Sequence, residues 1–437
     1  MRLPGEGRRK RRRLLWLGGA VLAPVLAGGT VAAQAGIAAA APAPAGHQPA
    51  LYVSHAGSSA NSDRSCRSAG YSSIAAAAGA AGAGGTVVVC PGTYHEQVVL
   101  TKQVTLEGKG ATISETGVTP ALKVTIPGVG SETIYAAVVI VSSHVTVTGL
   151  TISDADGEGI LAAGLGHAVT GIDIARDTVK HNDLGGGVPP ASPYFECAPT
   201  GAVPGDCGEG IHFAGNVADS VIRDSLVTGN SGGILLSDDV GPTDHNVVEN
   251  NDVTANVSDC GITVPGHNPN ALSASGAPQP AVAGVYGNVI RGNTVTGNGT
   301  QGAGSGVLLA DAAAGTASYD NLVEGNYIAG NGQSGVTMHA HIVAAGKFED
   351  LSGNVVAGNV IGKNNLKGDT LDSPASPTDT ATTGVLVYSG GTAVTETIAH
   401  NKISDNAIGV WLSKVVTASG LTSNRFSNVG TPVSAGH

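Results

Sequence analysis

Gly233-Ile-Leu-Leu and Gly261-Ile-Thr-Val share one pattern of glycine, apolar, variable and apolar residues. The same pattern starts at Gly210, Gly306, Gly335, Gly384 and Gly409. Alternation with a period of two predicts short strands in which the first and third side chains after glycine point inward. Glycine at the entrance of each strand suits a tight bend, where a positive φ costs this residue little.

Asparagines form a second register upstream of these strands. Pairs that are five residues apart stand at Asn251 and Asn256, Asn293 and Asn298, Asn326 and Asn331, Asn359 and Asn364, and Asn401 and Asn406. Further upstream, Asn246, Asn288, Asn321 and Asn354 each precede another Val/Ile/Leu-rich strand. One coil therefore contains three short strands, and asparagines stacked at one position can form amide ladders. The repeat predicts a solenoid, which also explains how a chain with only 3% aromatic residues fills its core.

The first coils resemble a known superfamily. Gly85-Thr-Val-Val-Val-Cys-Pro-Gly-Thr-Tyr-His-Glu, followed by Val104-Thr-Leu-Glu-Gly-Lys-Gly-Ala, looks like the opening of pectin-lyase-like proteins. The resemblance covers roughly residues 50 to 430 and implies an all-β, right-handed parallel β-helix with a short N-terminal capping helix. Ser72 to Ala81 fits that helix. The superfamily holds lyases, hydrolases, epimerases, adhesins and copper-delivery proteins, so the fold alone does not choose the chemistry.

The N-terminus has the features of a targeting segment. A cationic stretch from Arg8 to Arg13 precedes the apolar stretch Leu14 to Leu26, and Ala33-Gln34-Ala35 is a suitable cleavage site. We therefore predict a signal peptide at 1–35, an Ala/Pro-rich linker at 36–50 and a single β-helix domain at 51–437. The mature protein is expected to be secreted and monomeric, with no membrane insertion, although a retained anchor is the alternative.

The charge of the predicted mature chain narrows the choice of partners. Cleavage after Ala35 leaves 15 Lys and Arg against 32 Asp and Glu, a formal charge of −17. Such a surface repels nucleic acid and anionic lipid at long range. No cofactor is required by any motif, although an acidic surface is compatible with Ca²⁺.

Five cysteines in an exported chain predict disulfides and one remaining thiol. Cys66 with Cys90 ties the N-terminal segment to the first coil. Cys197 with Cys207 closes a small loop, and Cys260 competes for either member of that second pair.

Three insertions flank the column of glycine strands. Segments 183–209 and 365–383 enter just before a strand of this column, and segment 267–284 leaves just after one. They can wall a groove over the outward face of that column.

Candidate catalytic residues lie on three consecutive coils of this column: Asp238, Asp239, His267 and Asp311. Coils stack about 4.8 Å apart, so Asp239 and His267 are expected to approach hydrogen-bonding range. Paired carboxylates beside a histidine suit glycosidic cleavage, with one acid for the leaving oxygen and one base for water. The alternative is that each Asp caps a turn.

Other outward positions are candidates for substrate binding: His212, His339, His341, Tyr388 and Trp411. The two aromatic residues can stack on sugar rings or pack under a loop. Glu209 and Asp259, just before their glycines, can face the groove from its other side.

Individual families give conflicting indications. Asp238-Asp239 with Gly266-His267 resembles polygalacturonase motifs, but Asn268 replaces the final glycine and no Arg-Ile-Lys motif follows. Pectate lyases resemble the fold but use an Arg or Lys base, whereas no Arg occupies this column and Lys414 is remote along the solenoid. A lyase or epimerase with His339 or His341 as base is conceivable. The β-helix proteins of nitrous oxide reductase maturation resemble the repeat and imply copper handling through His212, His267, His339 and His341.

The favoured function is therefore binding, and cleavage in the case of an enzyme, of an extracellular polysaccharide. Asp238 and Asp239 would assist cleavage while His267 orients a carboxylate. A non-catalytic binding solenoid and a copper-handling protein are the alternatives.

Overall fold

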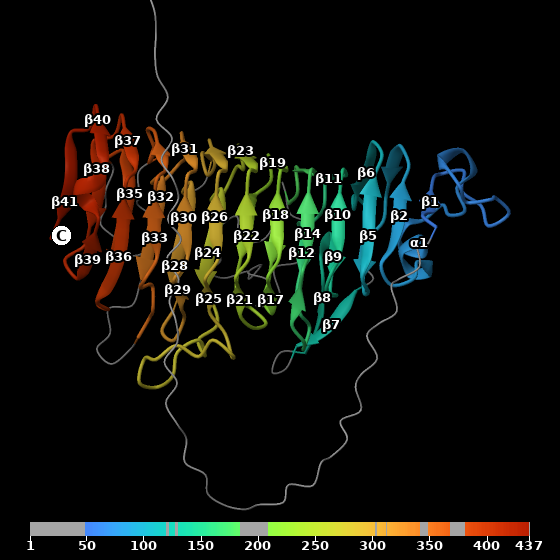
Figure 1. Ribbon diagram of the computed structural model, residues 1–437, viewed down its shortest axis with the longest axis horizontal. Coiled ribbons are helices and arrows are strands. Elements are labelled where there is room, and N and C mark those ends of the chain that lie inside the picture. Colours follow the sequence, from blue (N-terminus) through green and yellow to red (C-terminus); the bar gives the residue numbers. More distant parts are fainter. Residues whose placement is uncertain are drawn as a thin grey trace, which may run out of the picture. The chain divides into compact units, whose positions relative to one another are not determined.

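A computed structural model describes residues 49–118, 122–126, 130–183, 209–301, 304–311, 313–340, 348–367 and 381–436. The predicted signal peptide and nearly all of the predicted linker lie outside these ranges, as do Cys197, Cys207 and His341. The described chain coils into stacked parallel strands that follow one another from the blue N-terminal end to the red C-terminal end (Figure 1). The predicted right-handed parallel β-helix is confirmed.

Three long parallel sheets run along the described solenoid. Sheet A contains β1 (Leu51–Val53), β2 (Gly85–Val89), β5 (Val104–Gly108), β10 (Thr146–Thr148), β14 (Asp173–Ala175), β18 (Val221–Arg223), β22 (Val247–Glu249), β26 (Val289–Arg291), β30 (Leu322–Glu324), β33 (Val355–Ala357), β36 (Val394–Ala399) and β39 (Val416–Ser419). Sheet B contains β3 (Gly92–Tyr94), β6 (Ala111–Ser114), β11 (Thr151–Ser153), β15 (Thr178–Lys180), β19 (Leu226–Thr228), β23 (Asp252–Thr254), β27 (Thr294–Thr296), β31 (Tyr327–Ala329), β34 (Val360–Ile361), β37 (Lys402–Ser404) and β40 (Arg425–Ser427). Sheet C contains β4 (Val98–Leu100), β9 (Ala136–Ile140), β12 (Glu158–Ala162), β16 (Glu209–Phe213), β20 (Gly232–Leu236), β24 (Ile262–Gly266), β28 (Val307–Asp311), β32 (Val336–Ala340), β35 (Thr383–Ser389), β38 (Ile408–Leu412) and β41 (Thr431–Ala435).

Smaller elements complete the described solenoid. A short parallel sheet contains β13 (Val169–Thr170), β17 (Val217–Ala218), β21 (Thr243–Asp244), β25 (Val285–Tyr286) and β29 (Ser318–Tyr319). An antiparallel hairpin is formed by β7 (Lys123–Ile126) and β8 (Gly130–Thr133). The short 3₁₀ helices are η1 (Cys66–Ser68) and η2 (Leu421–Ser423).

Helix α1 (Ile74–Ala80) forms within the segment expected to be helical, and it packs against β1, β2 and β4. Its N-terminus is capped by Ser73, and the Glu96 carboxylate accepts hydrogen bonds from the amides of Ile74 and Ala75. Those contacts satisfy backbone N–H groups that a helix start leaves unpaired. None of the helices that the structure describes has the length and apolar character needed to cross a bilayer. The expected disulfide between Cys66 and Cys90 is present, and it joins η1 to the residue after β2.

The glycine strands form a single file, as predicted. The residue after each glycine pairs in parallel register with its counterpart in the next coil: Ile160, Ile211, Ile234, Ile262, Val307, Val336, Val385 and Val410. All of these side chains are fully buried and belong to one continuous core. Equivalent positions of consecutive coils are therefore neighbours in space.

The reason for glycine at these entrances differs from the expected one. The backbone of Gly210, Gly261 and Gly306 is not in the positive-φ region. A Cβ at Gly306 would instead lie 2.4 Å from Ile328 Cγ2 and 2.8 Å from Asn331 Nδ2. The prediction of a positive φ was wrong: glycine is needed because core and ladder side chains fill the space of a side chain.

Asparagine ladders run through the turns, as the five-residue spacing predicted. One ladder contains Asn182, Asn230, Asn256, Asn298, Asn331, Asn364 and Asn406. At Asn298 the backbone and side-chain amides both donate to Asn331 Oδ1, at 3.0 and 3.1 Å, and Nδ2 also donates to the Val253 carbonyl. Two further ladders follow the other two asparagine files. The ladders satisfy buried turn amides that no strand could pair.

Sheet C is buried on both faces through most of its described length. Apolar residues cover its outer face near the N-terminal end, where Val139 and Leu161 pack with Ile134, which directly follows hairpin strand β8. Near the C-terminal end, Leu386, Tyr388 and Trp411 form another outer cluster. Polar side chains of β12 and β16, and of the turns after β20 and β24, lie between these two clusters and form the candidate site.

Candidate functional site

Asp239 and His267 meet at the C-terminal edge of sheet C. Asp239 follows β20 and His267 follows β24 directly, and these two strands pair in register. His267 Nδ1 lies 2.9 Å from Asp239 Oδ1. The side chains are only 5% exposed for Asp239 and 16% for His267. The contact expected between these two residues is therefore confirmed.

Ser237 extends this pair to His212, a connection that the sequence analysis missed. Ser237 Oγ lies 2.8 Å from Asp239 Oδ2 and 2.8 Å from His212 Nε2. His212 is fully buried on β16, one coil below β20. The signal was available, because Ser237 stands four residues after Gly233 and so has the parity of an outward position.

The hydrogen-bond partners assign the protons in this network. An ionised Asp239 can only accept, so the Ser237 hydroxyl donates to it and accepts from His212 Nε2–H. The same carboxylate accepts from His267 when Nδ1 carries the proton, and in that tautomer Nε2 of His267 is the basic nitrogen. A carboxylate that fixes a histidine tautomer in this way prepares the ring for proton transfer.

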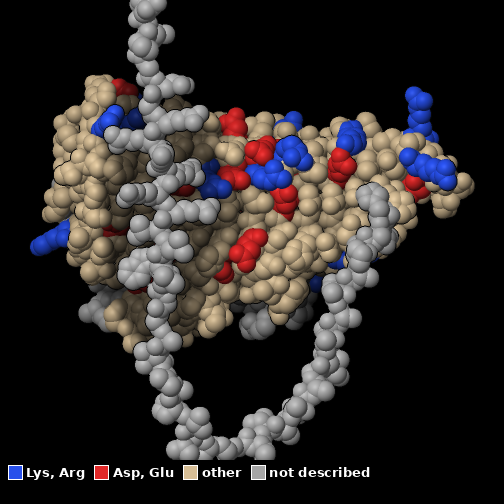
Figure 2. Space-filling model, in the orientation of Figure 1, with Lys and Arg blue, Asp and Glu red and all other residues tan. Residues whose placement is uncertain are grey.

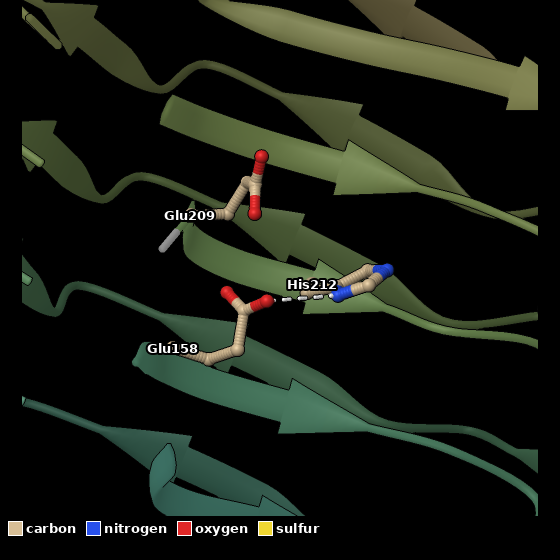
Figure 3. A group of neighbouring side chains, drawn as sticks. All are labelled: Glu158, Glu209 and His212. Atoms are coloured by element: carbon tan, nitrogen blue, oxygen red, sulfur yellow. Dashed lines mark hydrogen bonds and ion pairs between the residues drawn. The ribbon is translucent and has the colours of Figure 1, made fainter. Parts of the chain in front are cut away.

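Two glutamates complete the buried end of the network. Glu158 on β12 and Glu209 on β16 occupy equivalent positions of consecutive coils, since Ile160 pairs with Ile211. Glu158 Oε1 lies 3.1 Å from His212 Nδ1, and Figure 3 shows the Glu158 side chain reaching from β12 toward the coil of β16. Ligand atoms of Glu158, Glu209 and His212 all lie within 4.8 Å of one another.

Asp238 has a different task from its neighbour Asp239. Its carboxylate is fully buried and accepts hydrogen bonds from the backbone N–H groups of His267, Asn268 and Gly284, at 2.6, 3.0 and 2.7 Å. Burial raises the pKa of Asp238 to about 6, although the His267 ring and the backbone N–H groups of His267 and Asn268 act in the opposite direction. The Asp238 carboxylate therefore caps the turn after β24, which is the alternative stated above for each Asp. It does not pair with Asp239 as an acid and a base at a groove.

Asp311 does not face the predicted groove either. It ends β28 in register with Ala340, a core residue, and it is fully buried. Neither carboxylate oxygen of Asp311 has a hydrogen-bond partner among the described residues. Burial, with Glu349, Asp350, Asp238 and Glu396 nearby, raises the pKa of Asp311 well above its usual range. The expectation that Asp311 belongs to the outward site was wrong, because its odd distance from Gly306 turns the side chain inward.

The other described outward candidates, His339, Tyr388 and Trp411, are buried on β32, β35 and β38. His339 and Tyr388 are register partners whose rings meet edge to face, 6.2 Å apart. Trp411 is 4% exposed and packs with Tyr388. These aromatic residues pack inside a cluster, so the structure favours the packing alternative over stacking on sugar rings. His341 lies outside the described residues.

The open groove expected over sheet C is not observed along its described strands. The strands β9, β12, β16, β20, β24, β32 and β35 are buried at every residue. The prediction assumed that every side chain on the outer face of the sheet is exposed to solvent. Such a side chain is buried wherever another segment covers the sheet. Of the three insertions, only 267–284 lies entirely within the described ranges; there Ala271 and Leu272 pack against Ala317. Asp259, a secondary candidate, is also buried.

A shallow open groove of about 510 Å³ lies instead on the outside of sheet A. Its lining includes Glu249, Arg291, Glu324 and His400. Arg291 Nη2 lies 2.7 Å from Glu249 Oε2 across neighbouring coils. In Figure 2, acidic and basic side chains lie close together on this side of the molecule. The alternation of charge at the last residue of β22, β26 and β30 was a sequence signal that was not used.

Sequence comparison gives one partial match. The family model described as periplasmic copper-binding protein (NosD) matches residues 196–339 of the 437. This range contains Glu209, His212, Asp239 and His267 but not Glu158. No curated protein is significantly similar to the chain in sequence.

Structural comparison identifies distant β-helix proteins. An alginate lyase from Paenibacillus sp. str. FPU-7 has 15% identity and a TM-score of 0.47, and the match covers 83% of this chain and 96% of the lyase. The Dettilon tailspike protein (gp208) has 14% identity and a TM-score of 0.50, with 80% and 62% covered. The mannuronan C-5 epimerase AlgE4 A-module of Azotobacter vinelandii has 17% identity and a TM-score of 0.45, with 83% and 90% covered. At such identities the likeness concerns the fold alone, which is the parallel β-helix.

Proposed function

We propose that this chain is an exported β-helix protein that binds an extracellular polysaccharide and modifies it by proton transfer at His267. The observation that carries the proposal is the contact between Asp239 Oδ1 and His267 Nδ1, at 2.9 Å on the outer edge of sheet C. His267 is the most exposed of the residues in this network. The disulfide between Cys66 and Cys90 supports export, since such bonds persist in oxidising compartments.

The geometry favours a single base over a pair of carboxylates. Among the described residues, Asp239 is the carboxylate that hydrogen-bonds the His267 ring, while the Asp238 carboxylate is held by backbone N–H groups. A two-carboxylate glycosidase needs both groups to flank the bond that breaks. A histidine base with a fixed tautomer suits removal of a proton from a carbon next to a carboxylate. The proposed substrate is therefore a polymer that contains uronic acids.

The proposed reaction starts when His267 Nε2 takes the proton at C5 of a uronate residue. In a lyase, the bond between C4 and the glycosidic oxygen then breaks, a C4–C5 double bond forms, and the leaving oxygen receives a proton. In an epimerase, a proton returns to C5 from the opposite face and no bond of the chain breaks. The negative charge of Asp239 stabilises the imidazolium that forms in either case. We expect no cofactor to be required, and Ca²⁺ would act by offsetting charge between an acidic polymer and an acidic protein.

A screen of polyuronates and neutral glycans tests the proposal. Unsaturated products indicate a lyase, and exchange of the C5 hydrogen with deuterated water indicates an epimerase. New reducing ends without unsaturation indicate a hydrolase and would contradict the proposed proton transfer. His267→Gln and Asp239→Asn are each expected to lower the activity by about 10²-fold or more. Asp252→Asn, on an exposed position of β23, serves as the matched control.

A second candidate function is polysaccharide binding without catalysis, and the groove outside sheet A favours it. Its lining residues come from consecutive coils, so it follows the solenoid in the way that a linear polymer would. Under this alternative, Arg291→Ala weakens binding of the polymer and His267→Gln leaves it unchanged. Binding measurements with both variants therefore separate the two functions.

A further inference from the structure

The buried end of the network has an unusual concentration of acceptor atoms. Glu158 and Glu209 are stacked on consecutive coils beside His212, and all three side chains are buried. Two carboxylates that share one buried site repel each other unless a positive charge lies between them. A cation bound between the two carboxylates would offset this repulsion.

Proton accounting at His212 also points to a bound cation. Nε2 of this ring is used as the donor to Ser237 Oγ, whose own proton goes to Asp239. Nδ1 therefore directs a lone pair at Glu158 Oε1, 3.1 Å away, unless the ring carries a second proton. A lone pair and a carboxylate oxygen at this distance are both acceptors, which is the arrangement of two ligands of one metal ion.

The distances fit a divalent metal ion. Ligands about 2.1 Å from an ion in the tetrahedral geometry of zinc lie about 3.4 Å from each other, and His212 Nδ1 lies 3.1 Å from Glu158 Oε1. The third ligand is Glu209, which pairs with Gly232 of the next coil in the sheet register. Glycine leaves room for the Glu209 carboxylate, because a Cβ at Gly232 would lie 2.8 Å from Glu209 Oε1. Ser237 and Asp239 orient the ring from behind, as the outer partners of metal-binding histidines do.

We propose that Glu158, Glu209 and His212 hold a resident divalent cation of the zinc class. Two carboxylates and one imidazole suit Zn²⁺ and similar ions, while the set lacks the thiolate or thioether sulfur that Cu⁺ prefers. The ligands come from two coils, so the ion ties β12 to β16. Their burial makes release slow, which distinguishes a resident ion from a transported one. This inference stands apart from the proposed function, because it concerns metal content and stability and not the product of a reaction.

Metal analysis of the purified full chain tests the inference. After dialysis against Zn²⁺ and removal of loosely bound ions, elemental analysis should give about one zinc per chain. Cobalt, when substituted for zinc, should give visible absorption bands of low coordination number. Glu209→Gln and the double variant Glu158→Gln/Glu209→Gln should lower zinc affinity at least tenfold, with unchanged circular dichroism. Glu324→Gln, on the outside of sheet A, should bind zinc like the wild type.

Thermal denaturation with Zn²⁺, Cu²⁺, Mn²⁺ or Ca²⁺ added in turn gives an independent reading. Zn²⁺ is expected to raise the Tm of the wild type, and this rise should vanish in the double variant. Retention of zinc by the double variant, or a folded wild type that binds none of the four ions, would overturn the proposal. A response to Ca²⁺ alone would overturn the zinc class. A folded double variant that binds no zinc and whose Tm does not change when Zn²⁺ is added supports the site, because it separates metal binding from folding.

Discussion

His267 Nδ1 lies 2.9 Å from Oδ1 of Asp239, although 27 residues separate the two in the chain. The contact exists because β20 and β24 pair in register, so the turns that follow them meet at one edge of sheet C. A shift of one residue in either strand would turn one partner into the core. The candidate site therefore depends on the same register that builds the solenoid.

Asn298 tests the contribution of the ladders to stability. Asn298→Ala removes the acceptor of two amide groups of Asn256 and leaves the Val253 carbonyl without its donor. Each buried group left unsatisfied costs about 1–3 kcal/mol, so we expect a loss of about 3 kcal/mol in the free energy of unfolding. Urea denaturation measures this loss. Asn270→Ala, at an exposed loop position, is the control and should change the value by less than about 0.5 kcal/mol.

Gly306 tests the explanation for the glycine file. In Gly306→Ala the new Cβ would meet Ile328 Cγ2 at 2.4 Å and the Gly335 carbonyl oxygen at 2.6 Å. Overpacking against backbone cannot be relieved by a rotamer change, and we expect a loss of about 3 kcal/mol. Gly79→Ala in α1 meets no atom within 4 Å and should be neutral or stabilising by up to about 1 kcal/mol. Equal Tm values for the two variants would contradict this explanation.

Asp177 gives the stability of the fold a pH dependence. Burial raises the pKa of Asp177 to about 7, although the backbone N–H groups of Leu150 and Ala175 act in the opposite direction. Because the pKa is raised in the folded state, the stabilising contribution is complete below about pH 4, the range of an unfolded Asp, and is lost as the pH rises to about 7.

Asp177→Asn should remove this dependence. The amide carries no charge at any pH, so the variant should match the wild type near pH 4 and exceed its stability at pH 8. The difference is at most about 4 kcal/mol, since one pKa unit corresponds to about 1.4 kcal/mol. Urea denaturation at both pH values gives the comparison, and a variant that is less stable than the wild type at pH 8 would refute the raised pKa.

Much of the fold was predictable because the repeat records it directly. The glycine at each entrance and the asparagines five residues apart mark positions that contact their own counterparts, so their alignment in sequence is also their alignment in space. The meeting of Asp239 and His267 followed from that alignment. The sequence also contained the signal for Glu158, since Gly159-Ile-Leu-Ala fits the same pattern and Glu158 precedes it as Glu209 precedes Gly210.

Burial of the outer face was not predictable in the same way. Parity tells on which side of a strand a side chain lies, but not whether another segment covers it. Ile134, just after hairpin strand β8, packs against Val139 and Leu161 on that face through contacts that no repeat encodes. Asp311 shows the complementary error, because it still belongs to β28 and its inward parity takes the carboxylate into the core. The exact burial of a candidate residue therefore requires the structure.

The most direct test of the central claim is a double-mutant cycle on kcat/KM with the polyuronate that the screen identifies. If Asp239 and His267 act as one unit, Asp239→Asn and His267→Gln should each lower kcat/KM by about 10²-fold or more. The double variant should then be no worse than the His267→Gln variant alone. Losses that multiply in the double variant, or single variants that keep wild-type activity, would contradict the claim.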